Sequence, residues 1–483
     1  MASDIDDGFE DYDINALEPA GPPADDGDSG DPPLVRGSED ALAQSFVDQY
    51  HMAFKWTSGM DWMRDSGFRW ESDDNLRRYS LARIIARQAA ATATPPSTAR
   101  KIASSSTVNG LVNLARADPR IALPIQAWDS DPMALNTPAG IVDLRSGKLR
   151  ARCGDFVTRV TRVTPDWKTP TPYWTKFLEQ VFCQDEEMIE FMRRLLGYFI
   201  TADRREQKIF FAHGIGSNGK STLFNVFQWI VGDYALDLPA EVLMTQKNPG
   251  HPTELAQLMG VRIAISGEIE RGSHWAEARI NRLTGEETMS ARVMRGDPFT
   301  FTQTQKHLVI GNHKPKLKGG DPALVRRFVL IPFDAVFSAQ QRDKNMINKL
   351  RSEAAGILAW VIQGAVEWSD GGLQVPSKIE ASSSEYMESN DDVALWIDEC
   401  CILGATETAR AADLYWSFSQ WIRARGQFAC SLSVWADMMA VALEKNGIRA
   451  EKRRSNGIRY GGIGLNADQR SALVAHQAAG AKY

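Results

Sequence analysis

The sequence predicts an α/β protein whose core alternates strands and helices, with a mixed α+β region before it and a helical, winged-helix-like region after it. First, a short apolar run, Ile209–Ala212, enters a glycine-rich turn and then a helical pattern. Second, strand-like and helix-like segments alternate from 205 to about 335, as in a three-layer α/β domain. Third, the region 385–465 has the pattern of three helices followed by a basic hairpin, which is typical of a winged helix.

Composition is typical of a soluble protein without a membrane partner. Of the 483 residues, 43% are hydrophobic and 24% are charged. No apolar run approaches the ~20 residues of a membrane-spanning helix, and the acidic N-terminus does not resemble a secretory signal. The five cysteines, Cys153, Cys183, Cys400, Cys401 and Cys430, show no C-x-x-C spacing. We therefore interpret them as reduced thiols of an intracellular protein rather than as disulfides or zinc ligands.

Charge is unevenly distributed along the chain. The net charge is −6, but residues 1–40 hold 13 Asp and Glu residues against one arginine, Arg36. The rest of the chain has 54 basic and 48 acidic residues and carries about +6. Because so acidic a segment cannot bury enough apolar surface to fold, we expect 1–40 to be a disordered tail. A mildly basic body is compatible with a nucleic-acid partner.

Shifts in composition and periodicity divide the remaining chain into segments. They are a mixed α+β domain (41–165), a helical collar (166–204), the α/β core (205–338), a helical extension and linker (339–384), the winged-helix-like domain (385–465) and a C-terminal tail (466–483). An apolar stripe at helical spacing between Trp174 and Ile200 predicts the collar. In the mixed domain, the Ser/Thr/Pro-rich stretch Thr92–Ser106 is expected to separate two helices.

A phosphate-binding loop is predicted at Gly214–Thr222, which matches G-x-x-x-x-G-K-[ST] between a strand and a helix. Glycines let backbone N–H groups face a phosphate, and the N-terminus of the following helix favours an anion. Lys220 is suited to neutralise the β- and γ-phosphates, and the Ser221 hydroxyl to hold Mg²⁺. The predicted ligands are therefore ATP and Mg²⁺. The expected contacts are Gly214, Gly216, Ser217, Asn218, Gly219, Lys220, Ser221 and Thr222.

Polar side chains also stand at the ends of other predicted strands. Glu268 and Glu270 follow one strand, where carboxylates two residues apart point the same way. One is suited to the metal and the other to the attacking water, and spacing alone does not say which is which. Asn312 follows the next strand and is suited to hold that water, unless it is only a turn residue. Arg326 and Arg327 precede a further strand, where they fit either an arginine finger for a neighbouring subunit or a surface ion pair.

Two cationic hairpins are predicted. In the first, alternating segments flank Arg295–Pro298, so that basic residues lie near its tip. The second, Ile448–Leu465, carries Lys452, Arg453 and Arg454. Such charge runs often contact a phosphate backbone, and a solvated hairpin tip is the alternative.

Together these motifs resemble the superfamily 3 helicase domain of the phage and plasmid primase family, which includes the poxvirus primase-helicases. The motifs are the phosphate loop, the Glu-x-Glu pair, Leu283-Thr284-Gly285 before the first hairpin, the strand-terminal Asn312, and Arg326-Arg327-Phe328. The segment Trp128–Gly147 resembles the domain that precedes the helicase in this family, and Leu196-Gly197-Tyr198 also fits. The resemblance covers about residues 45–465.

The resemblance implies an AAA+-like ATPase that forms a hexameric ring and moves along single-stranded or forked DNA, with 3′→5′ polarity expected. It assigns catalytic roles to Lys220, Glu268, Glu270, Asn312, Arg326 and Arg327, with Ser221 and Glu268 at the metal. The expected DNA contacts are Arg282, Arg292, Arg295, Lys306, Lys452, Arg453 and Arg454. The chain departs from the family's usual Leu-Thr-Gly-Gly-Asp, because Glu286 and Glu287 follow Gly285, and Arg282 stands where a lysine is usual.

The expected role is that of a DNA helicase in the replication of a phage or mobile element, acting in the bacterial cytoplasm with a separate primase or polymerase. The stretch before Asp131-Pro132 is too short for the primase domain that many family members carry, so we expect a stand-alone helicase. One alternative is an origin-binding or loader assembly in which ATP only drives ring formation. A small-molecule kinase is a further alternative, but it explains neither the paired arginines nor the winged-helix pattern.

Overall fold

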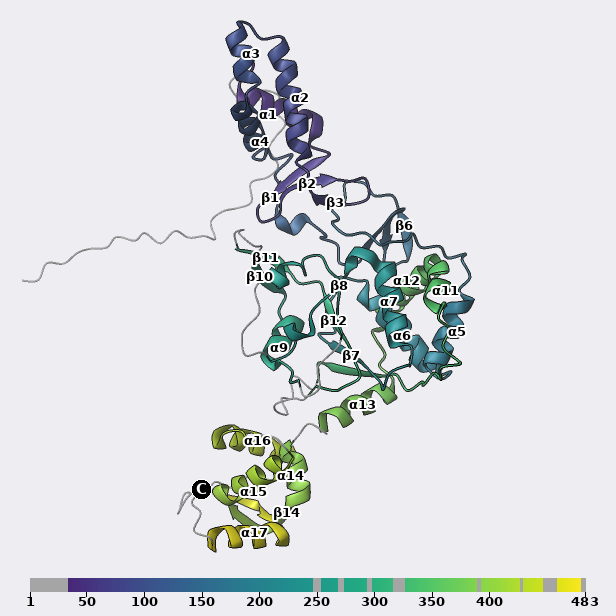
Figure 1. Cartoon of the computed structure of the whole chain (residues 1–483), viewed down its shortest axis with the longest axis vertical. Coiled ribbons are helices and arrows are strands. Elements are labelled where there is room, and N and C mark those ends of the chain that lie inside the picture. The colour runs from purple at the N-terminus through teal and green to yellow at the C-terminus, as the bar shows by residue number, and fades with distance from the viewer. Residues whose placement is uncertain are drawn as a thin grey trace, which may run out of the picture. The chain divides into compact units, whose positions relative to one another are not determined.

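The computed structural model describes residues 34–245, 253–267, 273–292, 298–315, 326–388, 392–425, 429–445 and 458–478 (Figure 1). These residues form two units. The first consists of the described residues up to Tyr50 together with Leu76–Asp118, and the second of His51–Asn75 and the chain from Pro119 onward. The range 41–165, expected as one domain, is thus divided between them.

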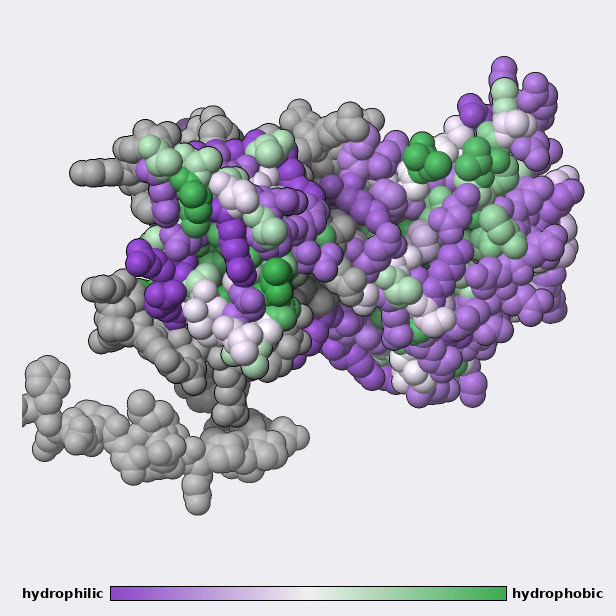
Figure 2. Space-filling model, turned by 90° about the horizontal axis from the view of Figure 1, so that it is seen from below, coloured by the Kyte–Doolittle hydropathy of each residue, from purple (hydrophilic) through white to green (hydrophobic). Residues whose placement is uncertain are grey.

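Neither the length of the described helices nor the visible surface points to a membrane-spanning segment in the described part of the chain. None of the described helices is long and apolar enough to cross a membrane. The face seen in Figure 2 is largely hydrophilic, with hydrophobic side chains in small separate groups.

The first unit is helical and has its own core. Its described helices are α1 (Glu39–Tyr50), α2 (Arg77–Ala91), α3 (Pro96–Ile102) and α4 (Ser105–Ala115). Phe46 of α1 and Leu111 of α4 are fully buried, and these two helices pack against each other. The stretch Thr92–Ser106 separates α2 from α4 as expected, but it contains the additional helix α3, which was not expected. Pro96 occupies the first turn of α3, where a proline costs the helix no hydrogen bond.

Two small antiparallel sheets open the second unit. One contains β1 (Phe54–Thr57), β2 (Asp61–Asp65) and β3 (Trp70–Ser72), and the other contains β4 (Ala134–Thr137), β5 (Gly140–Asp143) and β6 (Lys148–Arg150). Trp70, Trp128 and Phe156 pack together with ring centroids 5.6–5.8 Å apart. With Met63 of β2, this aromatic cluster provides a core for the first sheet, whose strands are too short to be stable alone.

The collar expected between Trp174 and Ile200 consists of two helices, α5 (Pro172–Val181) and α6 (Glu186–Phe199). The chain leaves the helical conformation at Cys183 and Gln184, whose φ angles are 54° and 63°. Asp185 then caps α6, because its carboxylate accepts a hydrogen bond from the N–H of Met188 at 3.1 Å. Two later helices, α11 (Met346–Ser352) and α12 (Ala354–Gly371), pack against α5 and α6.

Helices α6 and α12 cross at a pair of glycines. A Cβ atom at Gly197 would overlap the backbone of Ala365, and one at Gly364 would overlap the carbonyl group of Arg193. Side chains are excluded from both positions, so the glycines set the distance between the helices. The motif Leu196-Gly197-Tyr198 thus has a packing role at this crossing.

Replacing Gly197 by alanine is expected to destabilise the fold by about 1–3 kcal/mol, because the added methyl group meets backbone atoms of α12. The measurement is the midpoint of unfolding in chemical denaturant. Glu187→Ala, at an exposed position of the same helix, is the control and should shift the midpoint little. A Gly197→Ala protein as stable as the wild type would contradict the close crossing.

A five-stranded parallel sheet lies at the centre of the second unit. In spatial order its strands are β13 (Phe328–Pro332), β7 (Ile209–His213), β12 (Lys306–Gly311), β9 (Ile263–Ser266) and β8 (Ala235–Asp237). The expected alternation of strands and helices in this region is confirmed. Because all neighbouring strands are parallel, their carboxyl ends meet at one edge of the sheet.

Helices cover both faces of this sheet (Figure 1). On one face, Phe210 and Ala212 of β7 share a core with α7 (Lys220–Val231) and the collar helices. On the other face, Ile209 and Phe211 pack with residues of α9 (Glu277–Gly285) and α13 (Ser377–Glu388). Successive residues of the strand therefore face different layers, as in a parallel strand buried on both sides.

Between β9 and β12 the chain forms α9 and then an antiparallel hairpin of β10 (Thr288–Arg292) and β11 (Pro298–Thr302). The first predicted hairpin is thus confirmed as a pair of strands. The motif Leu283-Thr284-Gly285 lies at the C-terminal end of α9 and not within the hairpin. A short helix, α8 (Thr253–Ala256), packs against β10.

The described residues from 392 onward form a separate core. Their elements are α14 (Asp392–Cys400), β14 (Cys401–Arg410), α15 (Ala411–Ala424), α16 (Leu432–Lys445), β15 (Arg459–Leu465) and α17 (Ala467–Ala478). Trp396 and Trp435 are fully buried in this core. Two features were not anticipated. The segment β14 is a strand because it pairs with β15, and α17 replaces part of the expected tail because Leu473 packs into the core.

Candidate nucleotide site

The phosphate-binding loop joins β7 to α7, and its backbone requires glycine at several positions. Gly216 and Gly219 have φ angles of 97° and 86°, which residues with a side chain rarely adopt. A Cβ atom at Gly214 would overlap the carbonyl oxygen of Phe333. Because α7 begins at Lys220, the N-terminal end of this helix lies at the loop. The loop therefore has the features of an anion-binding site.

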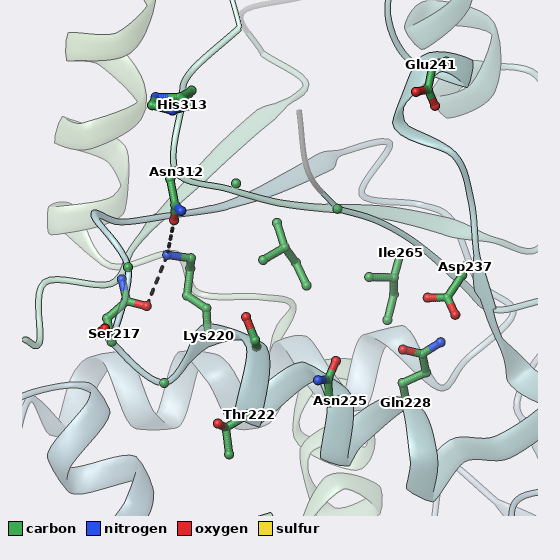
Figure 3. A pocket seen from close by; sticks show the side chains of 17 residues that line it. Ser217, Lys220, Thr222, Asn225, Gln228, Asp237, Glu241, Ile265, Asn312 and His313 are labelled. Carbon is green, nitrogen blue, oxygen red and sulfur yellow. Dashed lines mark hydrogen bonds between the residues drawn. The ribbon is translucent and has the colours of Figure 1, made fainter. Parts of the chain in front are cut away.

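Three oxygen acceptors hold the ammonium group of Lys220. It donates to the backbone oxygen of Gly214 at 2.8 Å and to the side-chain oxygen of Asn218 at 3.1 Å. It also donates to the side-chain oxygen of Asn312 at 3.2 Å (Figure 3). The Asn218 amide in turn donates to the carbonyl oxygen of Phe333 at 3.1 Å. Lys220 is only 4% exposed. Since Asn312 follows β12, its side chain connects the neighbouring strand to the loop.

The loop forms one wall of a pocket of about 1020 Å³. Its other walls come from α7 and from residues at the carboxyl ends of β8, β9 and β12. The carboxyl edge of a parallel sheet is the usual place for a ligand in an α/β fold, and the volume accommodates a nucleotide. Of the predicted contacts, Gly216 to Thr222 line the pocket, whereas Gly214 touches the site through its bond to Lys220.

Five polar residues of the pocket were not predicted. They are Asn225 and Gln228 of α7, Asp237 at the end of β8, Glu241 in the 3₁₀ turn that follows, and His313 directly after Asn312. Both carboxylates are exposed and lie across the pocket from Lys220 in Figure 3. Asp237 ends a short apolar strand, so the rule that singled out Glu268 would also have found it. No signal in the sequence marks the two amides on α7.

The predicted acidic pair lies outside the described residues. Glu268 and Glu270 follow β9, and the last described residue before them, Gly267, lines the pocket. The expected strand is present as β9, and it is buried between β8 and β12. The roles of the pair at the metal and at the attacking water remain predictions.

The paired arginines before β13 are in different environments. Arg326 is exposed, and its carbonyl oxygen accepts a hydrogen bond from Lys208 at 2.5 Å. Arg327 is half-buried and donates to the hydroxyl of Thr284 at 3.2 Å and to the carbonyl of Gln207 at 3.4 Å. The structure thus distinguishes the environments of two arginines, either of which could be the finger on sequence alone.

Few of the predicted DNA contacts can be located by their side chains. Arg282 is exposed on α9, one turn before the helix ends. Arg292 is the last residue of β10, and its side chain lies outside the described part of the chain. The remaining predicted contacts, Arg295, Lys452, Arg453 and Arg454, also lie outside it.

The prediction that Lys306 contacts DNA is wrong. Lys306 is 2% exposed at the start of β12. Its ammonium lies 5.0 Å from the ring centroid of Tyr198 and donates to the carbonyl oxygens of Thr201 and Thr304. Burial lowers the pKa of Lys306 well below its usual value. The side chain therefore fastens the sheet to the end of α6 and cannot reach a nucleic acid.

The environment of Lys220 predicts a measurable pH dependence. Burial lowers the pKa of Lys220 to about 8, so the free side chain loses its charge as the pH rises past that value. A bound phosphate favours the charged form and raises the pKa. Affinity for an ATP analogue is therefore expected to fall above about pH 8, by up to tenfold per pH unit.

Titration calorimetry between pH 7.5 and 9.5 measures this dependence. Buffers of different ionisation enthalpy should also reveal proton uptake on binding, which increases above pH 8. In Lys220→Ala the residual affinity should be independent of pH over this range. A wild-type affinity that does not change with pH would contradict a role for the Lys220 charge.

Two family descriptions match the chain. "D5 N terminal like" matches residues 43–183, and "Family of unknown function (DUF5906)" matches residues 212–327. The first range includes the helical unit, the small sheets and α5. The second begins in β7 and ends at Arg327, so it contains the phosphate loop, Asn312 and the paired arginines.

Viral proteins are among the relatives of the chain. It is 23% identical over 319 residues to "Putative helicase L207/L206" of Acanthamoeba polyphaga mimivirus, an alignment that covers 60% of this chain and 33% of the mimivirus protein. It is 26% identical over 277 residues to "Putative helicase 121R" of Invertebrate iridescent virus 3, covering 51% of this chain and 29% of that protein. The chain spans about a third of the length of these relatives.

The fold has a counterpart among solved structures. The apo structure of the NrS-1 C-terminal region (305–718) aligns with a TM-score of 0.50 and 12% identity, covering 88% of this chain and 99% of that chain. This similarity concerns the mixed α/β fold with its parallel sheet.

The domain match and the viral relatives place the chain among proteins similar to viral putative helicases. Together with the fold they support a D5-like primase-helicase of the phage and viral type, so the resemblance inferred from the motifs is confirmed.

Proposed function

We propose that this protein is an ATP-dependent DNA helicase with an AAA+-like core. The position of Lys220 carries the proposal. Its ammonium lies at the carboxyl edge of the parallel sheet, within a glycine-rich loop, and binds Asn312 from the neighbouring strand. Such an arrangement brings a phosphate-binding cation and a water-orienting amide to one point. The names of the viral relatives support DNA unwinding as the use of this chemistry.

The residues present fit a nucleoside triphosphate with Mg²⁺. The glycines leave room for phosphates against the backbone, and Lys220 can exchange its carbonyl and amide acceptors for phosphate oxygens. The Ser221 hydroxyl lines the pocket, and Asp237 and Glu241 add carboxylate oxygens, which Mg²⁺ and its water shell prefer. When bound, the metal neutralises charge on the β- and γ-phosphates.

In this proposal, different residues of the chain have different roles in hydrolysis. Lys220 holds the terminal phosphates, and Asn312 orients the attacking water. Glu268 or Glu270 accepts the proton from that water, and the other carboxylate faces the metal. In a hexameric ring, the exposed Arg326 of one subunit would reach the γ-phosphate bound to the next.

DNA contact in this proposal comes from the β10–β11 hairpin. In the order of the chain, its strands lie between α9 and β12, and Asn312 directly follows β12. The proposed contacts are Arg282 on α9, Arg292 at the end of β10, and four residues outside the described part of the chain, Arg295, Lys452, Arg453 and Arg454. Movement along a single strand with 3′→5′ polarity follows from the family resemblance.

Strand displacement tests this proposal. Purified protein with ATP and Mg²⁺ is expected to separate a duplex that has a single-stranded 3′ tail, and Lys220→Ala protein is expected not to. Hydrolysis of ATP without displacement of any tailed duplex would contradict the helicase assignment. ATP-dependent rings on DNA that survive a Glu268→Gln/Glu270→Gln double change with function intact would instead indicate a loader. DNA-independent turnover with a phosphorylated small molecule as product would indicate a kinase.

A further inference from the structure

Two arginines from other parts of the chain hold the C-terminal end of α9. Arg204, between the collar and β7, donates to the carbonyl oxygens of Leu283 and Glu286. Arg327, directly before β13, donates to the Thr284 hydroxyl at 3.2 Å. The last carbonyl groups of a helix have no partner within it, and positive charge is favoured at this end. These contacts therefore give the end of α9 a defined position against both segments.

The motif Leu283-Thr284-Gly285 is shaped for this contact. Thr284 is 5% exposed, and its hydroxyl donates to the carbonyl of Ile280 at 2.7 Å while accepting from Arg327. A Cβ atom at Gly285 would lie 3.2 Å from one guanidinium nitrogen of Arg327 and 3.5 Å from the other. Glycine therefore leaves the space that the guanidinium occupies beside the helix end.

The same helix end forms the base of the β10–β11 hairpin. Glu286 follows α9, and its carbonyl accepts a hydrogen bond from the side chain of Gln303 at 2.8 Å. The backbone N–H of Gln303 donates to the carbonyl of Glu287 at 2.8 Å, which closes the hairpin at its base. Gln303 also accepts from Gln305, which directly precedes β12. Hydrogen bonds through Gln303 and Gln305 thus connect the hairpin base to the start of β12. The bond between Thr284 and Arg327 connects the adjoining end of α9 to the start of β13.

We propose that Arg327 is a positioning residue that fastens β13, and with it Arg326, to the base of the hairpin. The inference rests on the proposed function, because only a DNA-dependent ATPase needs a connection between a DNA-contacting hairpin and an arginine finger. A hairpin displaced by DNA would carry the end of α9 with it, and Arg327 would pass that displacement to Arg326. Thr284 and Gly285 form the surface of α9 that Arg327 contacts, and Arg326 is the arginine that reaches the neighbouring subunit.

The contacts of Arg327 argue against a role as the finger itself. Its guanidinium is half-buried against Gly285 and bonded to Thr284 and Gln207 within its own subunit. To reach a neighbouring subunit it would have to break both hydrogen bonds and leave the helix end. Arg326, one residue earlier, is exposed.

Removing Thr284, the partner of Arg327, distinguishes a positioning role of the arginine from a role as arginine finger, because only the positioning role needs this partner. The variants are Thr284→Val, Arg327→Gln and the combination of both, and the readout is the ratio of kcat for ATP with and without single-stranded DNA. Positioning predicts that Thr284→Val lowers this ratio about 2- to 30-fold, that Arg327→Gln does the same, and that the double variant is no worse. Thr284→Ser keeps the hydroxyl and should retain the ratio.

Two further variants separate the effect of this contact from general effects of substitution. Gly285→Ala removes no hydrogen-bonding group, but its methyl group would press on the Arg327 guanidinium and should also lower the ratio. Thr406→Val makes the same chemical change as Thr284→Val at an exposed position of β14 and should leave the ratio unaltered. Thermal unfolding of each variant confirms that the fold is retained before its ratio is compared.

The outcomes distinguish this inference from the proposed function. In one outcome, DNA stimulates ATP turnover of the wild type, and Thr284→Val and Gly285→Ala proteins show the same kcat ratio as the wild type. This outcome would overturn the connection and leave the proposed function intact. Arg327→Gln protein that regains turnover when mixed with Lys220→Ala, while Thr284→Val behaves as wild type, would show that Arg327 acts on a neighbouring subunit and would also overturn it. A wild-type protein whose ATP turnover does not respond to DNA would overturn the proposed function, and the connection with it.

Discussion

Arg326→Ala is expected to slow ATP hydrolysis by about 10³–10⁵-fold, the range found where an arginine finger is removed. Arg326 is exposed, while the adjacent Arg327 is bonded to Thr284 within the same chain. An arginine that stabilises charge in the transition state lowers kcat and leaves ground-state binding of ATP largely intact. The measurement is therefore kcat together with the affinity for an ATP analogue.

Mixing experiments show whether this arginine acts between subunits. A mixture of Arg326→Ala and Lys220→Ala protein should regain part of the activity, because some interfaces then combine an intact loop with an intact arginine. Arg342→Ala changes another exposed arginine of the same unit and should preserve kcat. Mixtures that stay inactive at every ratio would show that Arg326 does not act on its neighbour.

Replacing Lys220 by alanine is expected to reduce ATP turnover by about 10²–10³-fold or more, because it removes the cation that faces the terminal phosphates. The change also leaves three oxygen atoms, on Gly214, Asn218 and Asn312, without the donor they now share. Binding of an ATP analogue should weaken in parallel, since the lysine acts in the ground state as well. Both quantities can be measured on the same preparation.

Loss of the site must be separated from loss of the fold. Lys344→Ala, at an exposed lysine, is the matched control for activity. Thermal unfolding of Lys220→Ala should remain close to that of the wild type, because removing a buried charge also removes its desolvation cost. Retained ATP turnover in a folded Lys220→Ala protein would exclude the phosphate loop from the mechanism.

Much of the candidate site could be predicted because it depends on local conformation. The turn between β7 and α7 needs positive φ angles at Gly216 and Gly219, and these glycines are visible in the sequence. The apolar runs predicted parallel strands, whose carboxyl ends share one edge of a sheet. That geometry alone was enough to expect Asn312 beside the loop, where the structure places it.

The less predictable features depend on contacts between distant segments. Lys306 was expected to contact DNA, but Tyr198 and Thr201, which lies 105 residues earlier, enclose its side chain. Asp237 and Glu241 enter the pocket only because β8 lies at the edge of the sheet beyond β9. Pairing between β14 and β15 likewise made a strand of a segment with no strong local preference.

The sequence by itself determined the phosphate loop, the order of strands and helices around it, and the family that the chain resembles. Each of these follows from residue type, spacing and periodicity within short stretches. Only the tertiary structure decided which charged side chains are buried and which are exposed. Lys306 is enclosed and Arg327 is half-buried against Thr284, whereas Arg326 is exposed, because burial arises from the packing of segments that are far apart in the chain.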